Sequence, residues 1–240
     1  MKIRFTVLCT ALTMLALLVG VGQAEHFATI STDELLAARA KKSGLVLINA
    51  LSPVEFNQEA ISGSINIPAS HMRSDHPLLP ADKSTPLVFY CKGLRCTKSR
   101  RAAKLAMEFG YTNVRIYSPG LPGWKKRGLP VVHSVSYPDI EPPALSPLEV
   151  YQSRETALLL DIRGEEVSQV GEISNTVKIA LDDLDKKYET LPRDRRIIII
   201  DHAGRQAPIS ARYLYKMGYH DVAVLQGGMI GWVRAGLPVE

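Results

Sequence analysis

Two of the three cysteines in this 240-residue chain, Cys91 and Cys96, lie close together in a segment rich in positive charge. Cys91 directly follows the apolar run Leu87–Tyr90. The basic residues around the two cysteines are Lys92, Arg95, Lys98, Arg100 and Arg101. The thiolate is the reactive form of cysteine, and neighbouring cations stabilise it. The segment therefore predicts a reactive thiol that meets an anionic reactant.

The position of Cys91 between two predicted elements favours the same chemistry. An amphipathic helix follows the loop, since Ala102, Ala106 and Phe109 recur at helical spacing. In open α/β sheets the active crevice lies at the carboxyl ends of the strands. A loop there faces the N–H groups and the positive dipole end of the following helix, which stabilise a thiolate and attract an anion.

The rest of the chain repeats one pattern twice. Segments 120–124 and 128–131 recur as 228–232 and 236–239 at a shift of 108, and segments 45–49 and 61–67 recur as 157–161 and 173–179 at a shift of 112. We therefore predict two domains, 25–135 and 146–240. Prolines make the segment between them, 136–145, a stiff linker.

Each copy alternates strands with helices. Ser31 caps a first helix in one copy, and Ser146 followed by Pro147 does so in the other. The predicted strands are 45–48, 64–67, 87–90 and 114–117 in the first copy, and 158–160, 176–179, 197–200 and 222–225 in the second. Uninterrupted apolar runs suit strands buried on both faces of a parallel sheet, which predicts an α/β fold.

The N-terminal segment reads as a secretory signal peptide. Lys2 and Arg4 precede an apolar run over 5–21, and Gly22 and Ala24 place small residues before a cleavage point. We predict cleavage after Ala24, which removes residues 1–24 and Cys9 and leaves a periplasmic or secreted protein without stable membrane insertion. Retention of the run as an N-terminal anchor is the alternative.

Composition excludes several classes of protein. Three cysteines are too few for a disulfide scaffold, and the six histidines show no metal-ligand spacing, so we expect neither metal nor cofactor. The net charge of +5 is modest and the basic residues are spread along the chain, which disfavours nucleic acid as a partner.

The order of these motifs in both copies resembles the rhodanese (sulfurtransferase) family. The residues that carry the likeness are Glu55-Phe56, 61–68, Tyr90-Cys91, Gly110-Tyr111, Gly120 and Trp124. The resemblance implies two tandem domains, each a small central parallel sheet flanked by helices. It also implies that the Cys91 thiolate attacks the outer sulfur of a small anionic donor such as thiosulfate. The resulting persulfide passes its sulfur to cyanide, a thiol or a protein acceptor.

Residues of the loop after Cys91 are the candidates for binding substrate: Lys92, Gly93, Leu94, Arg95 and Thr97. Arg95, between the cysteines, is the best candidate for binding an anion. The loop departs from the usual family pattern and looks like the variants with a C-x-G-x-x-C-x-x-S loop. It also contributes to a spacing to Gly110 that is two residues longer than in the second copy.

The second copy has Asp201 where the first has Cys91. A carboxylate carries no transferable sulfur, so we predict a catalytically silent domain that packs against the active one and shapes its cleft. His202 is expected to be an exposed loop residue. Trp124 and Trp232 are expected to anchor a core or a domain interface.

Three interpretations of Cys96 stay open. It is a resolving cysteine that forms a disulfide with Cys91 or accepts its sulfur, or it is the nucleophile itself, or it is a loop residue without a chemical role. The alternative to an enzyme is a redox-sensing or binding module on the same scaffold. A phosphatase of this fold needs arginine six positions after the cysteine, where this chain has Thr97.

Overall fold

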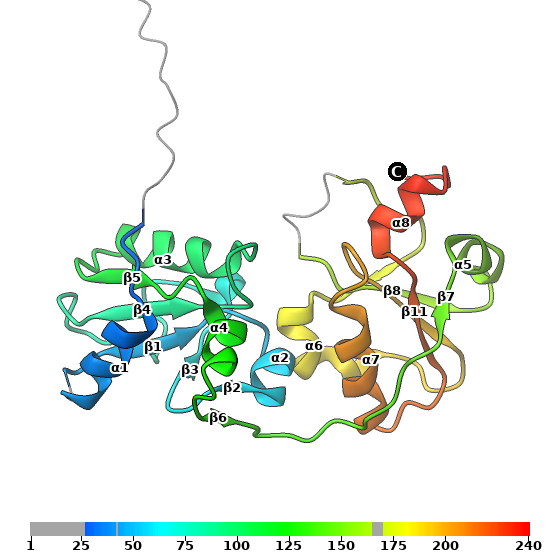
Figure 1. Cartoon of the computed structure of the whole chain (residues 1–240). Coiled ribbons are helices and arrows are strands. Elements are labelled where there is room, and N and C mark those ends of the chain that lie inside the picture. The colour runs from blue at the N-terminus through cyan, green and yellow to red at the C-terminus, as the bar shows by residue number, and fades with distance from the viewer. Residues whose placement is uncertain (1–26, 42, 165–169) are drawn as a thin grey trace, which may run out of the picture.

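The computed structural model describes residues 27–41, 43–164 and 170–240, which form two similar units, each built around a parallel sheet flanked by helices (Figure 1). The α/β fold predicted from the sequence is therefore confirmed. The predicted signal peptide, 1–24, lies outside the described residues.

The first sheet has the strand order β3-β1-β4-β5 with every pair parallel. Its strands are β1 (Val46–Asn49), β3 (Ile65–Asn66), β4 (Leu87–Tyr90) and β5 (Val114–Ile116). All four residues of the central strand β4 are buried, because helices cover both faces of the sheet. The carboxyl end of β4 therefore points into the loop that holds the two cysteines.

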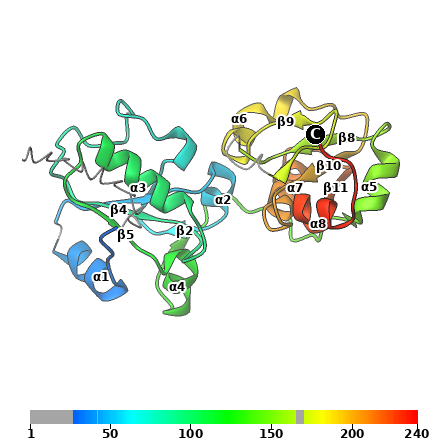
Figure 2. The ribbon, with the colours of Figure 1, turned by 90° about the horizontal axis from the view of Figure 1, so that it is seen from above.

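Helices cover both faces of this sheet, with different helices on each face. They are α1 (Thr32–Ala40), α2 (Pro53–Gln58), α3 (Lys98–Glu108) and α4 (Gly120–Lys126), with a short 3-10 helix η1 (Ala69–His71) and an antiparallel pair β2 (Ala60–Ile61) and β6 (Val131–Val132). Ala102, Ala103 and Ala106 of α3 pack on one face, and α1 and α4 cover the other (Figure 2). Small alanines let α3 lie close to the sheet.

Helix α2 was not among the elements predicted from the sequence, although its start has a clear pattern. The Ser52 hydroxyl accepts a hydrogen bond from the Glu55 N–H, the Glu55 carboxylate accepts one from the Ser52 N–H, and Pro53 lies in the first turn. This is a capping box, which is readable from sequence. The same device at Ser31 and at Ser146 confirms the two helix starts that were predicted.

The second unit repeats the architecture with the strand order β7-β11-β10-β8-β9. Its strands are β7 (Ala144–Leu145), β8 (Leu158–Asp161), β9 (Val177–Lys178), β10 (Ile197–Ile200) and β11 (Val222–Leu225). Its helices are α5 (Pro147–Ser153), α6 (Leu184–Lys187), α7 (Ala207–Lys216) and α8 (Gly228–Arg234), with 3-10 helices η3 (Leu181–Asp183) and η4 (Tyr188–Thr190). The segment predicted as a linker, 136–145, ends in β7, which pairs with β11.

Trp124 and Trp232 occupy equivalent places in the two cores. Each is 1% exposed. The indole N–H of Trp124 donates to the Pro130 carbonyl and that of Trp232 to the Pro238 carbonyl, both at 2.9 Å. The prediction that the tryptophans are structural anchors is confirmed, and each anchors the core of its own unit.

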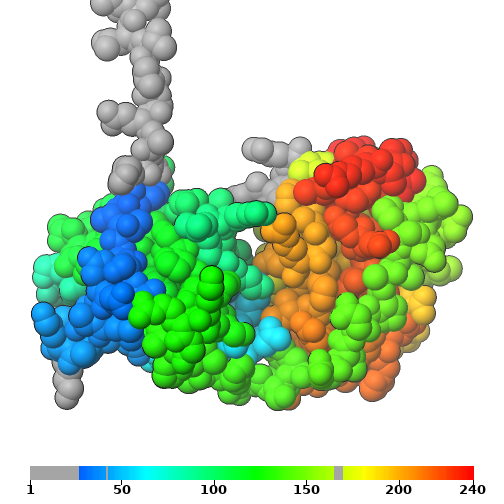
Figure 3. Space-filling view, viewed as in Figure 1, coloured from blue at the N-terminus to red at the C-terminus, as the bar shows by residue number. Residues whose placement is uncertain are grey.

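The two units pack against each other (Figure 3). Val54 of α2 joins the apolar cluster of the second unit, and its carbonyl accepts a hydrogen bond from the Tyr137 hydroxyl at 2.9 Å. Beside this contact the Ser70 hydroxyl donates to Asp182 at 2.6 Å, and His71 contacts Asp183 at 2.9 Å. The interface thus combines an apolar centre with polar contacts.

Candidate functional site

Cys91 lies at the floor of the loop between β4 and α3. Its side chain is buried, with the residue 1% exposed. The sulfur lies 3.3 Å from the Ser99 hydroxyl, 3.6 Å from the Cys96 carbonyl oxygen and 3.9 Å from that of Gly93. The thiol of Cys91 therefore has oxygen neighbours from both sides of the loop.

The loop makes a turn between the two cysteines, which brings Cys96 back beside Cys91. The Cys96 N–H donates to the Gly93 carbonyl at 3.0 Å, and Gly93 has a φ of +101°, which glycine adopts without strain. Both cysteines are free thiols, Cys91 buried and Cys96 partly exposed. The Cys91 sulfur lies 3.6 Å from the Cys96 carbonyl oxygen, and the two side chains are close enough to shift each other's pKa.

This contact makes the two thiols unequal acids. The hydrogen bond from Cys91 lowers the pKa of Cys96 to about 6, and the backbone N–H groups of Lys98 and Lys92 act in the same direction against burial. The same bond, together with burial, raises the pKa of Cys91. The two shifts run in opposite directions, so the arrangement favours the charged form of Cys96 and the neutral form of Cys91.

Two lysines near the pair are held by carboxylates. Lys92 lies 2.6 Å from Glu55, whose side chain is 1% exposed. Burial by itself raises the pKa of Glu55, but the charges of Lys92 and Lys98 outweigh burial and hold that pKa below its ordinary value. Lys98, the first residue of α3, lies 2.7 Å from Asp182 of the second unit. The loop is thus tied to α2 and to the other unit.

The other predicted binding residues face solvent. Leu94 is 69% exposed, and Arg95 and Thr97 are exposed as well. Thr97 and Lys98 line a cleft of about 400 Å³ between the two units. Residues 91–96 are not part of its lining. The structure therefore brings Thr97 to this cleft, leaves Leu94 and Arg95 exposed outside it, and packs the Gly93 backbone against Gly120.

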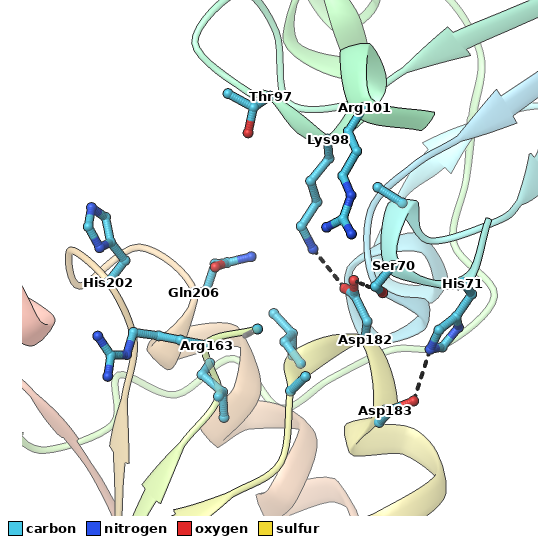
Figure 4. A pocket seen from close by; sticks show the side chains of 15 residues that line it. Ser70, His71, Thr97, Lys98, Arg101, Arg163, Asp182, Asp183, His202 and Gln206 are labelled. Carbon is cyan, nitrogen blue, oxygen red and sulfur yellow. Dashed lines mark hydrogen bonds and ion pairs between the residues drawn. The ribbon is translucent and has the colours of Figure 1, made fainter. Parts of the chain in front are cut away.

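Both units supply polar side chains to the cleft (Figure 4). Lys98 and Arg101 come from α3, and His202 and Gln206 come from the loop after β10. His202 is partly buried in this wall, where its carbonyl accepts from the Ile230 N–H of α8, so the expectation of an exposed loop residue was wrong. The prediction that the second unit packs against the first is confirmed.

Asp201 shows what the equivalent loop of the second unit stabilises. Its carboxylate accepts hydrogen bonds from the backbone N–H groups of Gly204, Gln206 and Ala207, at 2.5, 2.6 and 3.0 Å. The Met229 N–H donates to the Asp201 carbonyl at 2.9 Å, as the Leu121 N–H does to the Cys91 carbonyl at 2.9 Å. The two loops share this backbone hydrogen bond to the next helix, and the second holds a carboxylate at its floor.

Gly120 and Gly228 fix the approach of the next helix to each loop. A Cβ on Gly120 would lie 2.3 Å from the Cys91 carbonyl oxygen and 2.5 Å from the Gly93 nitrogen. A Cβ on Gly228 would lie 2.5 Å from the Asp201 carboxylate. From the sequence, both glycines served to align the repeat, and Gly120 was also one of the residues that carry the family likeness. Their recurrence beside the two loops was the available indication of this packing.

The described residues contain no group of three or more His, Cys, Asp and Glu side chains arranged to hold a metal ion. None of the helices in the described ranges is both long and apolar enough to span a membrane.

Relatives of known sequence match one unit of the chain at a time. A sulfurtransferase from Allochromatium vinosum is 32% identical over 85 residues, covering 35% of this chain and 79% of the relative. A putative sulfurtransferase, YtwF, from Bacillus subtilis is 32% identical over 84 residues, which cover 35% of this chain and 81% of the relative.

Solved structures are similar at lower identity. A thiosulfate sulfurtransferase from Pseudomonas aeruginosa covers 89% of this chain with 23% identity and a TM-score of 0.43, and this chain spans 43% of its length.

The model of the rhodanese-like domain matches residues 31–127 and again residues 146–235. These two ranges contain the two sheets, the cysteine loop and the Asp201 loop. The chain therefore belongs to the rhodanese family and contains the rhodanese-like domain twice.

Proposed function

We propose that this protein is an exported sulfurtransferase that moves sulfane sulfur from a small anionic donor such as thiosulfate to cyanide, a thiol or a protein acceptor. The carrier is a persulfide on Cys91. The observation that supports it most is the thiol pair at the carboxyl end of β4, which holds a negative charge beside backbone N–H groups. Membership in a family that contains sulfurtransferases supports the reaction class.

The first step uses the charge that the two thiols share. Cys96 takes the proton of Cys91 through their hydrogen bond while the Cys91 sulfur attacks the outer sulfur of the donor. The S–S bond of thiosulfate breaks and sulfite leaves with the electron pair. A persulfide anion remains at the loop floor, where the second unit holds the carboxylate of Asp201.

The second step returns the loop to its starting state. An acceptor attacks the outer sulfur of the persulfide, and the electron pair of the broken bond goes back to Cys91. The lysine Lys98 and the arginine Arg101 in the cleft attract an anionic donor toward the start of α3. In this scheme the second unit supplies a wall and carries no sulfur.

Replacement of Cys91 by serine tests the carrier. Cys91→Ser is expected to abolish thiosulfate:cyanide sulfur transfer, because serine forms no persulfide, whereas Cys96→Ser retains part of the activity. Measuring both rates under saturating thiosulfate decides the point. Turnover that survives in Cys91→Ser and disappears in Cys96→Ser would move the carrier to Cys96.

One observation favours a second candidate function, a redox-sensing module without turnover. Cys91 is 1% exposed and already contacts Cys96, as expected of a pair that only switches between thiols and disulfide. The intact mass after incubation with thiosulfate separates the two functions. Gain of one sulfur atom or release of sulfite supports the enzyme, and neither product with any sulfane donor supports the sensor.

A further inference from the structure

We propose that Cys96 attacks the Cys91 persulfide, so that the loop releases its sulfur as hydrosulfide and closes as a Cys91–Cys96 disulfide. This inference rests on the proposed persulfide at Cys91. It adds an activity, the reductive release of sulfide, and it names the chemical class of the next reactant, a thiol reductant that reopens the disulfide.

The geometry of the loop carries the inference. The turn from Gly93 to Cys96 brings the second cysteine back beside the first, so that the Cys91 sulfur lies 3.6 Å from the Cys96 carbonyl oxygen, and each thiol shifts the pKa of the other. The inner sulfur of a persulfide is the Cys91 sulfur itself, which lies 3.3 Å from the Ser99 hydroxyl and is buried. Loading a sulfur atom therefore leaves the atom that Cys96 must attack in its present place.

The step balances without any reagent beyond the donor. Cys96 attacks the Cys91 sulfur, the bond between the two cysteine sulfurs forms, and the bond to the outer sulfur breaks. The electron pair leaves with the outer sulfur, which takes the Cys96 proton and departs as hydrosulfide. Two thiols are oxidised to a disulfide while the sulfane sulfur is reduced. With thiosulfate, the products are the disulfide, sulfite and hydrosulfide.

Cys96 could attack either sulfur of the persulfide, and leaving-group chemistry favours attack on the inner sulfur. Attack on the outer sulfur would instead pass that sulfur to Cys96. Attack on the outer sulfur would expel the Cys91 thiolate, whose pKa burial and the bond to Cys96 raise. Attack on the inner sulfur expels hydrosulfide, the conjugate base of a stronger acid. The thiol of lower pKa leaves faster in exchange reactions. Cys96, with its lowered pKa, is the attacking thiol.

The test is a single turnover without reductant. The full chain carrying Cys9→Ser, so that the loop holds all the thiols, is reduced, freed of reductant and mixed with thiosulfate under anaerobic conditions. Sulfite, sulfide, free thiols and intact mass are measured, and a sample without thiosulfate controls for oxidation by residual air. We expect one sulfite and one sulfide per chain, loss of both thiols and a mass lower by two hydrogen atoms.

Cys96→Ser in the same background separates the proposed release of sulfide from the proposed sulfur transfer on which it depends. This variant is expected to release sulfite, gain one sulfur atom and release no sulfide. Sulfite with a stable persulfide and no sulfide in the parent chain would overturn the inference while leaving the sulfurtransferase intact. Sulfide release that persists in Cys96→Ser would also overturn it. If the parent chain releases no sulfite, the proposed function itself fails.

Discussion

The two thiols differ in position and in acidity. Cys91 lies at the floor of the loop, directly after the last residue of β4. Backbone N–H groups and Lys98 favour the charged form of the Cys96 thiol. Near neutral pH the negative charge is therefore available without deprotonating the buried sulfur by an outside base. In the proposed reaction the same loop supplies the nucleophile and its proton acceptor.

The acidity of Cys96 depends on Cys91, and alkylation measures this dependence. In the parent chain the rate of Cys96 alkylation by iodoacetamide should rise with pH through about 6, the pKa of this thiol. Cys91→Ala removes the hydrogen bond that lowers this pKa most, so the midpoint should move to higher pH. Peptide mass spectrometry identifies the alkylated cysteine. An unchanged midpoint would show that the N–H groups and Lys98 suffice.

At the scale of elements, the strand–loop–helix order fixes where the loop lies, and close backbone packing fixes its shape. The N–H of Leu121 in α4 donates to the Cys91 carbonyl, which is possible only because Gly120 lacks a side chain. The loop is thus held between the end of β4 and the start of α4. Its conformation depends on a residue distant from the cysteines in sequence.

Gly120→Ala should therefore distort the loop. The new Cβ meets backbone at 2.3 Å, and the φ of +59° disfavours alanine. We expect a loss of about 3 kcal/mol in the free energy of unfolding and a larger relative loss of sulfur transfer. Gly128→Ala is the matched control, since its φ is +65° but no atom lies within 4 Å, and it should cost about 1 kcal/mol. Urea unfolding and the transfer assay measure both variants, and equal effects would contradict the packing argument.

The strands were predictable because each is an apolar run in the sequence. The contacts between elements were not predictable. The prediction matched β4, β10 and β11 closely, because an uninterrupted buried run has few other uses in an α/β chain. The place of Cys91 followed from the end of β4. The hydrogen bond between the thiols depends on the turn at Gly93, and the pairing of Lys98 with Asp182 joins residues far apart in sequence. Local patterns carry no information on such contacts.

At the scale of the whole molecule, the second unit is part of the environment of the loop. Asp182 accepts from Lys98 and from Ser70, so it joins the start of α3 and η1 to the second unit. The charge of Asp182 holds the pKa of Lys98 above its ordinary value against the effect of burial. Lys98 in turn favours the Cys96 thiolate. The second unit therefore influences the charge of the cysteine loop through one ion pair.

Asp182→Asn should weaken the joint between the units. The Asp182 side chain is 10% exposed and that of Lys98 27% exposed, so removing the carboxylate takes from a largely buried ammonium the counter-charge that affects its pKa most. We expect a loss of about 3 kcal/mol in the free energy of unfolding. Asp221→Asn, which breaks the exposed pair with Arg196, is the control and should cost about 0.5 kcal/mol. Urea unfolding followed by tryptophan fluorescence compares them, and similar costs would show that the joint does not depend on this pair.

The carboxylate of Asp201 has a practical consequence. It accepts from the N–H groups of its own loop at the position where the first loop has Cys91, and the next helix donates the same backbone hydrogen bond to both positions. One chain thus contains a loop with two thiols and an equivalent loop with none, folded together in the same solution. A reagent that depends on sulfur should therefore label the first half of the molecule alone.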